Sequence, residues 1–236
     1  MLISEGIVKI STLERENINR YFTSMERFTN KLFKKQAYAD DELGKLMLDY
    51  SNAIKSQYGL GDVNIYYAYL TTRKEEATFN PDSNTIFINL MHFSGQAMPP
   101  FGNYIIDQLV YDGMRENFEH EYVHFKQNEL YKAATGRPLP SPSTFEKWEE
   151  YIKKPMEHMA FAAQELQWIK NKMHNIKPQE ILRYLSKWGL TRNTRLDNLK
   201  RTDYDSWKNI MKYASMFALQ DMAKKSTGTA KAVRLP

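Results

Sequence analysis

The residues best suited to chemistry are two histidines and a glutamate within five positions, His120-Glu121-Tyr122-Val123-His124. On a helix the two histidines lie about 40° apart around the axis and one turn apart along it, so both imidazoles can reach one metal ion. Glu121 lies about 100° from His120, where its carboxylate can take a proton from zinc-bound water and pass it to a leaving amine. The motif therefore predicts a hydrolase with zinc ligands His120 and His124 and general base Glu121.

A catalytic zinc site needs a third protein ligand, and this chain has no cysteine to supply it. We predict Glu157, in the first turn of a helix that begins at Pro155, because the positive end of the helix dipole favours an ionised carboxylate there. His158 and Glu165 are the competing ligands. His158 points about 100° away from Glu157 on that helix, so the two side chains do not easily aim at one metal.

Apolar periodicity and turn residues predict a mainly helical protein with a small sheet. A hairpin is expected to close at residues 80–84, because Asn80-Pro81-Asp82-Ser83-Asn84 combines a proline with turn-forming side chains. Strands are expected at 63–70, 77–79 and 85–90, and helices at 11–35, 40–54, 104–112, 114–132, 143–151, 155–172, 178–188 and 206–224.

The helix that carries the motif is expected to be buried, with Phe118, Tyr122 and Phe125 on one flank and Val123 and Leu130 on another. Buried surroundings suit a metal site. The alternative is a pair of hydrogen-bonded core histidines without a metal, which would leave the glutamate between them a coincidence.

The stretch HEYVH, followed by PMEHMAFAAQ at residues 155–164, resembles the zincin metallopeptidases of the gluzincin type, in particular small bacterial and phage members. In that family a glutamate on the following helix completes the zinc site. The preceding ATFNPDSNTIFIN is similar to the family's hairpin, whose edge strand can pair with an extended substrate. The resemblance covers residues 63–172 and implies an α+β zincin-like fold, zinc as cofactor and a peptide or protein substrate. Candidates for the oxyanion donor are Tyr151 and His158.

The composition is that of a globular protein, with 42% hydrophobic, 26% charged and 13% aromatic residues. The net charge is +5, but four of the basic residues lie among the last 13 residues, and the rest of the chain has 29 basic and 28 acidic residues. Nucleic-acid binding is therefore not expected. The sequence shows neither a signal peptide nor a membrane-spanning stretch, which favours a cytoplasmic or virion-associated protein.

We expect a zincin-like domain over residues 1–175, with its core at 63–172 and N-terminal helices at 11–58. A C-terminal helical extension (176–225) and a basic tail (226–236) would follow it. The extension lies outside the resemblance and carries apolar helical faces that could dock a protein partner or a second copy of the chain. The alternative function is therefore a structural or assembly protein, for example a phage virion component, on a zincin-like fold whose metal site is retained or vestigial.

Overall fold

The chain folds into two compact units in the computed structural model. One unit comprises Leu13–Ser141, and the other comprises Met1–Thr12 together with Pro142–Pro236. The structure describes residues 10–33, 40–60, 63–68, 76–90, 108–140, 148–173, 176–188 and 194–229.

The unit Leu13–Ser141 combines helices with a small sheet. Its hairpin is built as the sequence predicts, because the Asn80 side chain accepts hydrogen bonds from the backbone N–H groups of Asp82 and Ser83, at 3.0 and 3.1 Å. Asn84 then adopts a left-handed conformation with φ of 54°. The elements of the unit are α1 (Thr12–Phe33), α2 (Asp40–Ile54), the 3-10 helix η1 (Lys55–Tyr58), β1 (Asn64–Ala68), β2 (Ala77–Asn80), β3 (Thr85–Asn89) and α4 (Gln108–Thr135).

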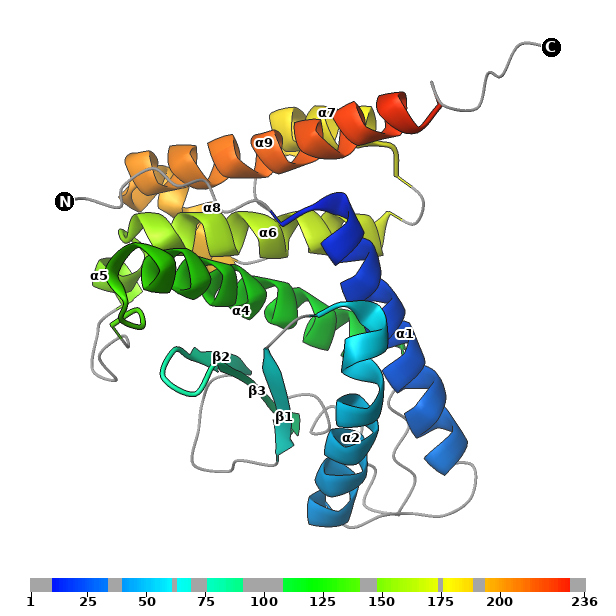
Figure 1. Ribbon diagram of the computed structural model, residues 1–236. Helices are drawn as coiled ribbons and strands as arrows, with labels where there is room; N and C mark the ends of the chain where they lie inside the picture. The colour runs from blue at the N-terminus through cyan, green and yellow to red at the C-terminus, as the bar shows by residue number, and fades with distance from the viewer. Residues whose placement is uncertain are drawn as a thin grey trace. The chain divides into compact units, whose positions relative to one another are not determined.

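The sheet has the strand order β1-β3-β2 (Figure 1). Strand β1 is parallel to β3, whereas β2 and β3 are the antiparallel arms of the hairpin. Helix α2 packs against β1, and α4 packs against β2 and β3. The structure thus confirms the predicted α+β class, mainly helical with a small mixed sheet against the helix that carries the motif.

Aromatic side chains fix α4 between α1 and the hairpin. The ring of Phe118 lies 5.3 Å from that of Phe22 and 6.3 Å from that of Tyr21 on α1. On the hairpin side, Phe79 of β2 meets Phe125 edge to face at 6.2 Å. Burial of these rings stabilises the unit by roughly 1.5–3 kcal/mol for each side chain and fixes how α4 is turned about its axis.

Two predictions about α4 are wrong. The expected break near Gly113 is absent, because α4 continues through it as one helix, and an interior glycine costs only about 1 kcal/mol. Leu130 was expected to be buried but is 47% exposed. The other four predicted apolar positions, Phe118, Tyr122, Val123 and Phe125, are buried as expected. Residues 104–107 of the predicted helix lie outside the described residues.

The other unit is helical in its described part, with α5 (Trp148–Tyr151), α6 (Pro155–Lys172), α7 (Pro178–Trp188), α8 (Thr194–Thr202) and α9 (Tyr204–Thr229). Helices α6, α7 and α8 each pack against α9 (Figure 1). The predicted bounds of α6 and α7 are confirmed, and both helices begin at a proline. Helix α8 was not predicted, because Leu196 and Leu199 are its only apolar residues.

No helix in the described parts of the chain is both long enough and apolar enough to cross a membrane. Residues 143–147 of the helix predicted at 143–151 lie outside those parts. The boundaries of a zincin-like domain over 1–175, an extension over 176–225 and a tail over 226–236 stay predictions.

Candidate metal centre

Helix α4 brings the two histidines of the motif together at the nitrogen atoms that bind metals. The Nε2 atoms of His120 and His124 are 3.3 Å apart, with the ring planes at 72° to each other. Two imidazole ligands about 2.0–2.1 Å from a tetrahedral zinc ion have nitrogen atoms about 3.3–3.4 Å apart. The pair therefore has the separation that zinc requires.

The same geometry would also fit a direct hydrogen bond between the rings. Such a bond needs one Nε2 to carry a proton and the other to accept it. His124 makes a second contact through its other nitrogen, because Nδ1 lies 2.8 Å from Oε1 of Gln127. An amide oxygen can only accept a hydrogen bond, so with this contact a neutral His124 ring would carry its proton on Nδ1 and a lone pair on Nε2.

The motif is partly open to solvent. His120 is buried, with 5% of its surface exposed, whereas His124 and Glu121 are half-buried. A catalytic site needs a protected metal ligand and a side that a substrate can reach. On α4 the buried His120 and the half-buried Glu121 and His124 project at different angles from two neighbouring turns.

A buried ion pair lies beside the motif on α4. The Nε atom of Arg15 on α1 is 3.9 Å from Oε2 of Glu119, and both side chains are almost fully buried. Glu119 directly precedes His120 in the sequence, so this contact ties α1 to the helical turn that carries the first histidine. A buried charge without its partner would cost several kcal/mol, which makes this a strong constraint on the position of that turn.

Two asparagines tie the hairpin to α4, one on each side of the motif in sequence. The Asn117 amide donates to Oε2 of Glu76, next to the start of β2, at 2.6 Å. The buried Asn128 amide donates to the Pro81 carbonyl at 3.1 Å and to Oδ1 of Asn84 at 3.3 Å, in the turn that ends β2. Strand β2 is thus held against α4 at both ends, which fixes the edge of the sheet relative to the two histidines.

The outer edge of β2 presents backbone groups to a further strand. The Asn89 N–H donates to the Glu76 carbonyl at 2.9 Å, and in this register the backbone groups of Ala77 and Phe79 point away from β3. Among the described residues no strand pairs with β2 on that side. Within the part of the chain that the structure describes, β2 is therefore an edge strand of the sheet.

Glu157 lies in the first turn of α6, as predicted, and is 4% exposed. Pro155 is at the start of that helix, so the carboxylate sits near the positive end of the helix dipole. Glu157 belongs to the unit Pro142–Pro236, whereas the histidine pair belongs to Leu13–Ser141. Its role as third ligand stays a prediction. The competing ligands His158 and Glu165 lie on the same helix, and both are buried.

No protein-family model, no curated protein and no solved structure matches this chain.

The two candidate oxyanion donors lie in the unit Pro142–Pro236. The Tyr151 ring packs edge to face against Phe161 at 6.3 Å. Burial lowers the pKa of His158, against the opposing effect of a hydrogen bond to the Ile152 backbone and the negative charge of Asp203. The part of either side chain in oxyanion binding stays a prediction.

Sequence reasoning missed Gln127, Asn117 and Asn128, which orient the motif or its neighbours. The signal for Gln127 was its spacing, three residues after His124, which places both side chains on one face of a helix. The two asparagines had no comparable signal, because their partners on the hairpin are 41 to 47 residues away in sequence.

Proposed function

We propose that this chain is a zinc-dependent metallopeptidase with a zincin-like fold of the gluzincin type. His120, His124 and Glu157 are the metal ligands, and Glu121 is the general base. The 3.3 Å separation of the two histidine Nε2 atoms carries the proposal, because it matches the spacing of zinc-bound imidazoles. The absence of cysteine supports the same donor set of imidazole and carboxylate groups.

Zinc bound at this centre would act as a Lewis acid on the scissile carbonyl and acidify the attacking water. The Glu121 carboxylate takes one proton from that water as its oxygen bonds to the carbonyl carbon. It then gives the proton to the peptide nitrogen as the carbon–nitrogen bond breaks, which releases two peptides. An extended substrate pairs with the outward backbone groups of Ala77 and Phe79 on β2.

The test compares cleavage of an unstructured protein by the native chain and by Glu121→Gln, with zinc content measured in both. We expect Glu121→Gln to keep its zinc and to lose activity by about 10²–10⁴-fold, because the amide cannot accept the proton. Chelation of the metal should abolish cleavage by the native chain. Zinc bound by the native chain without any cleavage would contradict the peptidase.

Glu157→Ala tests the third ligand, with Glu165→Ala as its matched control. Both residues are buried glutamates of α6, so both replacements remove a carboxylate from the same helix. Only Glu157→Ala should weaken zinc binding. Zinc held at full affinity in Glu157→Ala would remove Glu157 from the ligand set, and a loss confined to Glu165→Ala would transfer the role to Glu165.

A second candidate is a structural or assembly protein, such as a virion component, that retains the metal site. The observation that favours it is the exposure of large apolar residues on α9, where Tyr204 is 56% and Leu219 is 50% exposed. Such residues suit a protein partner or a second copy of the chain. Bound zinc without cleavage, with association that Leu219→Lys disrupts, would favour this candidate over the peptidase.

A further inference from the structure

We propose that Gln127 is a positioning residue that sets the tautomer of His124 and thereby prepares it for the metal. This inference rests on the proposed metal site, but it concerns a contact within one helix. The Gln127 Oε1 atom lies 2.8 Å from Nδ1 of His124, and the Nε2 atom of the same ring lies 3.3 Å from Nε2 of His120. One imidazole is thus held at both of its nitrogen atoms.

The chemistry of the amide decides which nitrogen carries the proton. A neutral imidazole has one N–H and one lone pair, and the hydrogen bond at one nitrogen determines the state of the other. The Gln127 oxygen accepts from Nδ1–H, so Nε2 of His124 has a lone pair directed toward His120. In the other tautomer a proton on Nε2 would occupy the position in which both rings meet the metal.

Burial makes this preference strong enough to matter. Gln127 is 7% exposed, so water competes weakly for its amide oxygen. With its oxygen at Nδ1, as in the structure, the amide favours the Nδ1–H tautomer, whereas an amide nitrogen in that place would favour the opposite one. Oxygen acceptors of this kind orient metal-binding histidines in general, and their removal typically weakens metal binding by about 10–100-fold.

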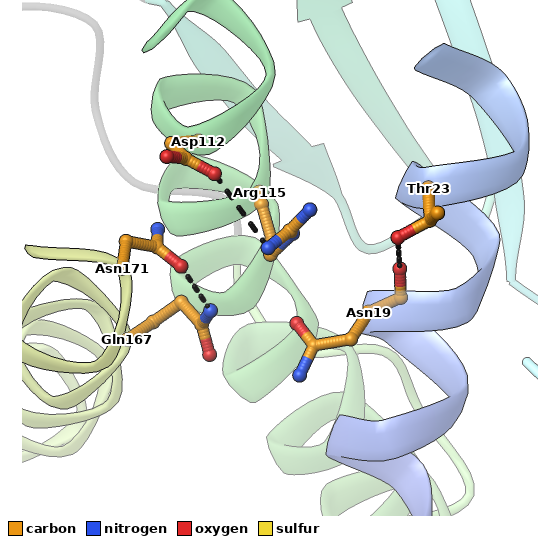
Figure 2. Close-up of polar contacts among 6 residues, drawn as sticks. All are labelled: Asn19, Thr23, Asp112, Arg115, Gln167 and Asn171. Atoms are coloured by element: carbon orange, nitrogen blue, oxygen red, sulfur yellow. Dashed lines mark hydrogen bonds and ion pairs between the residues drawn. The ribbon is translucent and has the colours of Figure 1, made fainter. Parts of the chain in front are cut away.

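Contacts between polar side chains three or four residues apart are ordinary in these helices. Figure 2 shows two of them, the ion pair of Asp112 with Arg115 at 3.6 Å and the hydrogen bond from Gln167 to Asn171 at 2.8 Å. Neither involves an imidazole. Gln127 differs because its oxygen contacts Nδ1 of His124, whose Nε2 is the proposed metal-binding atom. The same helical spacing therefore affects metal binding.

The test measures zinc affinity by competition with a chelator in Gln127→Leu and Gln127→Glu. Gln167→Leu is the matched control, since it removes a buried amide and its contact within a helix from α6. Gln127→Leu should bind zinc about 10–100-fold more weakly, whereas Gln127→Glu should bind at least as well as the native chain, because its carboxylate accepts the same hydrogen bond. The control should bind zinc as the native chain does.

Nitrogen-15 NMR of the metal-free native chain gives a second, independent measurement. We expect His124 to be protonated on Nδ1 there, and Gln127→Leu to lose that preference. A proton on Nε2 of His124 in the native chain would overturn the inference, as would equal zinc affinity in Gln127→Leu and the native chain. A native chain that binds no zinc would instead contradict the proposed function. The NMR measurement on the metal-free chain would then still show whether Gln127 sets the tautomer of His124.

Discussion

Helices α4 and α9 have similar lengths, 28 and 26 residues, but bury different kinds of side chain. Among its described side chains, α9 buries Ile210, Ala214, Phe217 and Ala218, together with Ser206 near its start. The polar residues that α4 buries are Arg115, Glu116, Glu119, His120, Gln127 and Asn128. Buried polar groups cost free energy unless they are paired, and proteins retain them chiefly where function needs them. The difference agrees with the proposal that α4 carries two of the metal ligands.

The buried polar groups of α4 form pairwise contacts with particular partners, whereas the buried side chains of α9 are mostly apolar. Glu119 pairs with Arg15, and Asn128 binds the carbonyl of Pro81. Removing one partner leaves the other buried and unsatisfied, which is a larger penalty than the net gain of the contact. Single polar replacements should therefore lower the free energy of unfolding more on α4 than on α9. Replacing the partner residue as well should restore part of that loss.

The largest effect is expected for Arg15→Leu, which leaves the Glu119 carboxylate buried without its cation. The free energy of unfolding should fall by about 3–5 kcal/mol in urea titrations. The double variant Arg15→Leu/Glu119→Leu should recover most of that loss, because neither charge remains. Arg20→Leu is the control on an exposed arginine of the same helix and should change stability by no more than about 0.5 kcal/mol. A double variant as unstable as Arg15→Leu would contradict the buried pair.

A smaller effect is expected for Asn128→Ala, which removes the contact between α4 and the hairpin turn. The Pro81 carbonyl and the Leu139 N–H each lose a partner, the latter from a hydrogen bond of 2.8 Å. The loss in free energy of unfolding should be about 1–3 kcal/mol. The exposed Asn52 on α2 gives the control Asn52→Ala. Equal stability of the two variants would show that the turn does not depend on Asn128.

The sequence predicted most where a local signal determines the structure. The prolines at positions 155 and 178 predicted where α6 and α7 begin, and the turn residues at 80–84 predicted the hairpin. The spacing of His120 and His124 predicted that their side chains lie close together on α4, because helical geometry alone determines this separation.

The sequence predicted least where partners are distant or the apolar pattern is weak. Helix α8 was missed because a short, highly charged segment shows almost no hydrophobic periodicity. Leu130 was predicted to be buried because it lies on the same helix flank as Val123, yet it is exposed near the C-terminal end of α4. The contacts of Asn117 and Asn128 depend on how the hairpin packs, which no local pattern encodes.

The smallest effect concerns Asp203, which caps the start of α9. Desolvation alone would raise the pKa of its carboxyl, but hydrogen bonds from the Ser206 backbone N–H and hydroxyl outweigh it, so the pKa lies below its ordinary value. A lowered pKa in the folded state means that this contribution to stability is present above the ordinary value of 3.8 and disappears as the pH falls through the folded pKa.

Asp203→Ala should therefore lower the free energy of unfolding by about 1 kcal/mol at pH 7, with a difference that shrinks toward pH 2. Thermal or urea unfolding at both pH values measures it. Asp49→Ala, on an exposed aspartate of α2, should show neither effect. A constant difference at both pH values would mean that the charge of Asp203 is not what stabilises the helix.

We propose above all that the histidine pair of α4 binds a metal ion. The direct measurement is a zinc titration of the chain after removal of metal by a chelator, with the native sequence and with His120→Ala/His124→Ala. We predict one zinc ion per native chain. The double variant should lose affinity by more than the roughly 10–100-fold typical for a residue that only orients a ligand. No zinc bound by the native chain, or equal binding by the double variant, would contradict the claim.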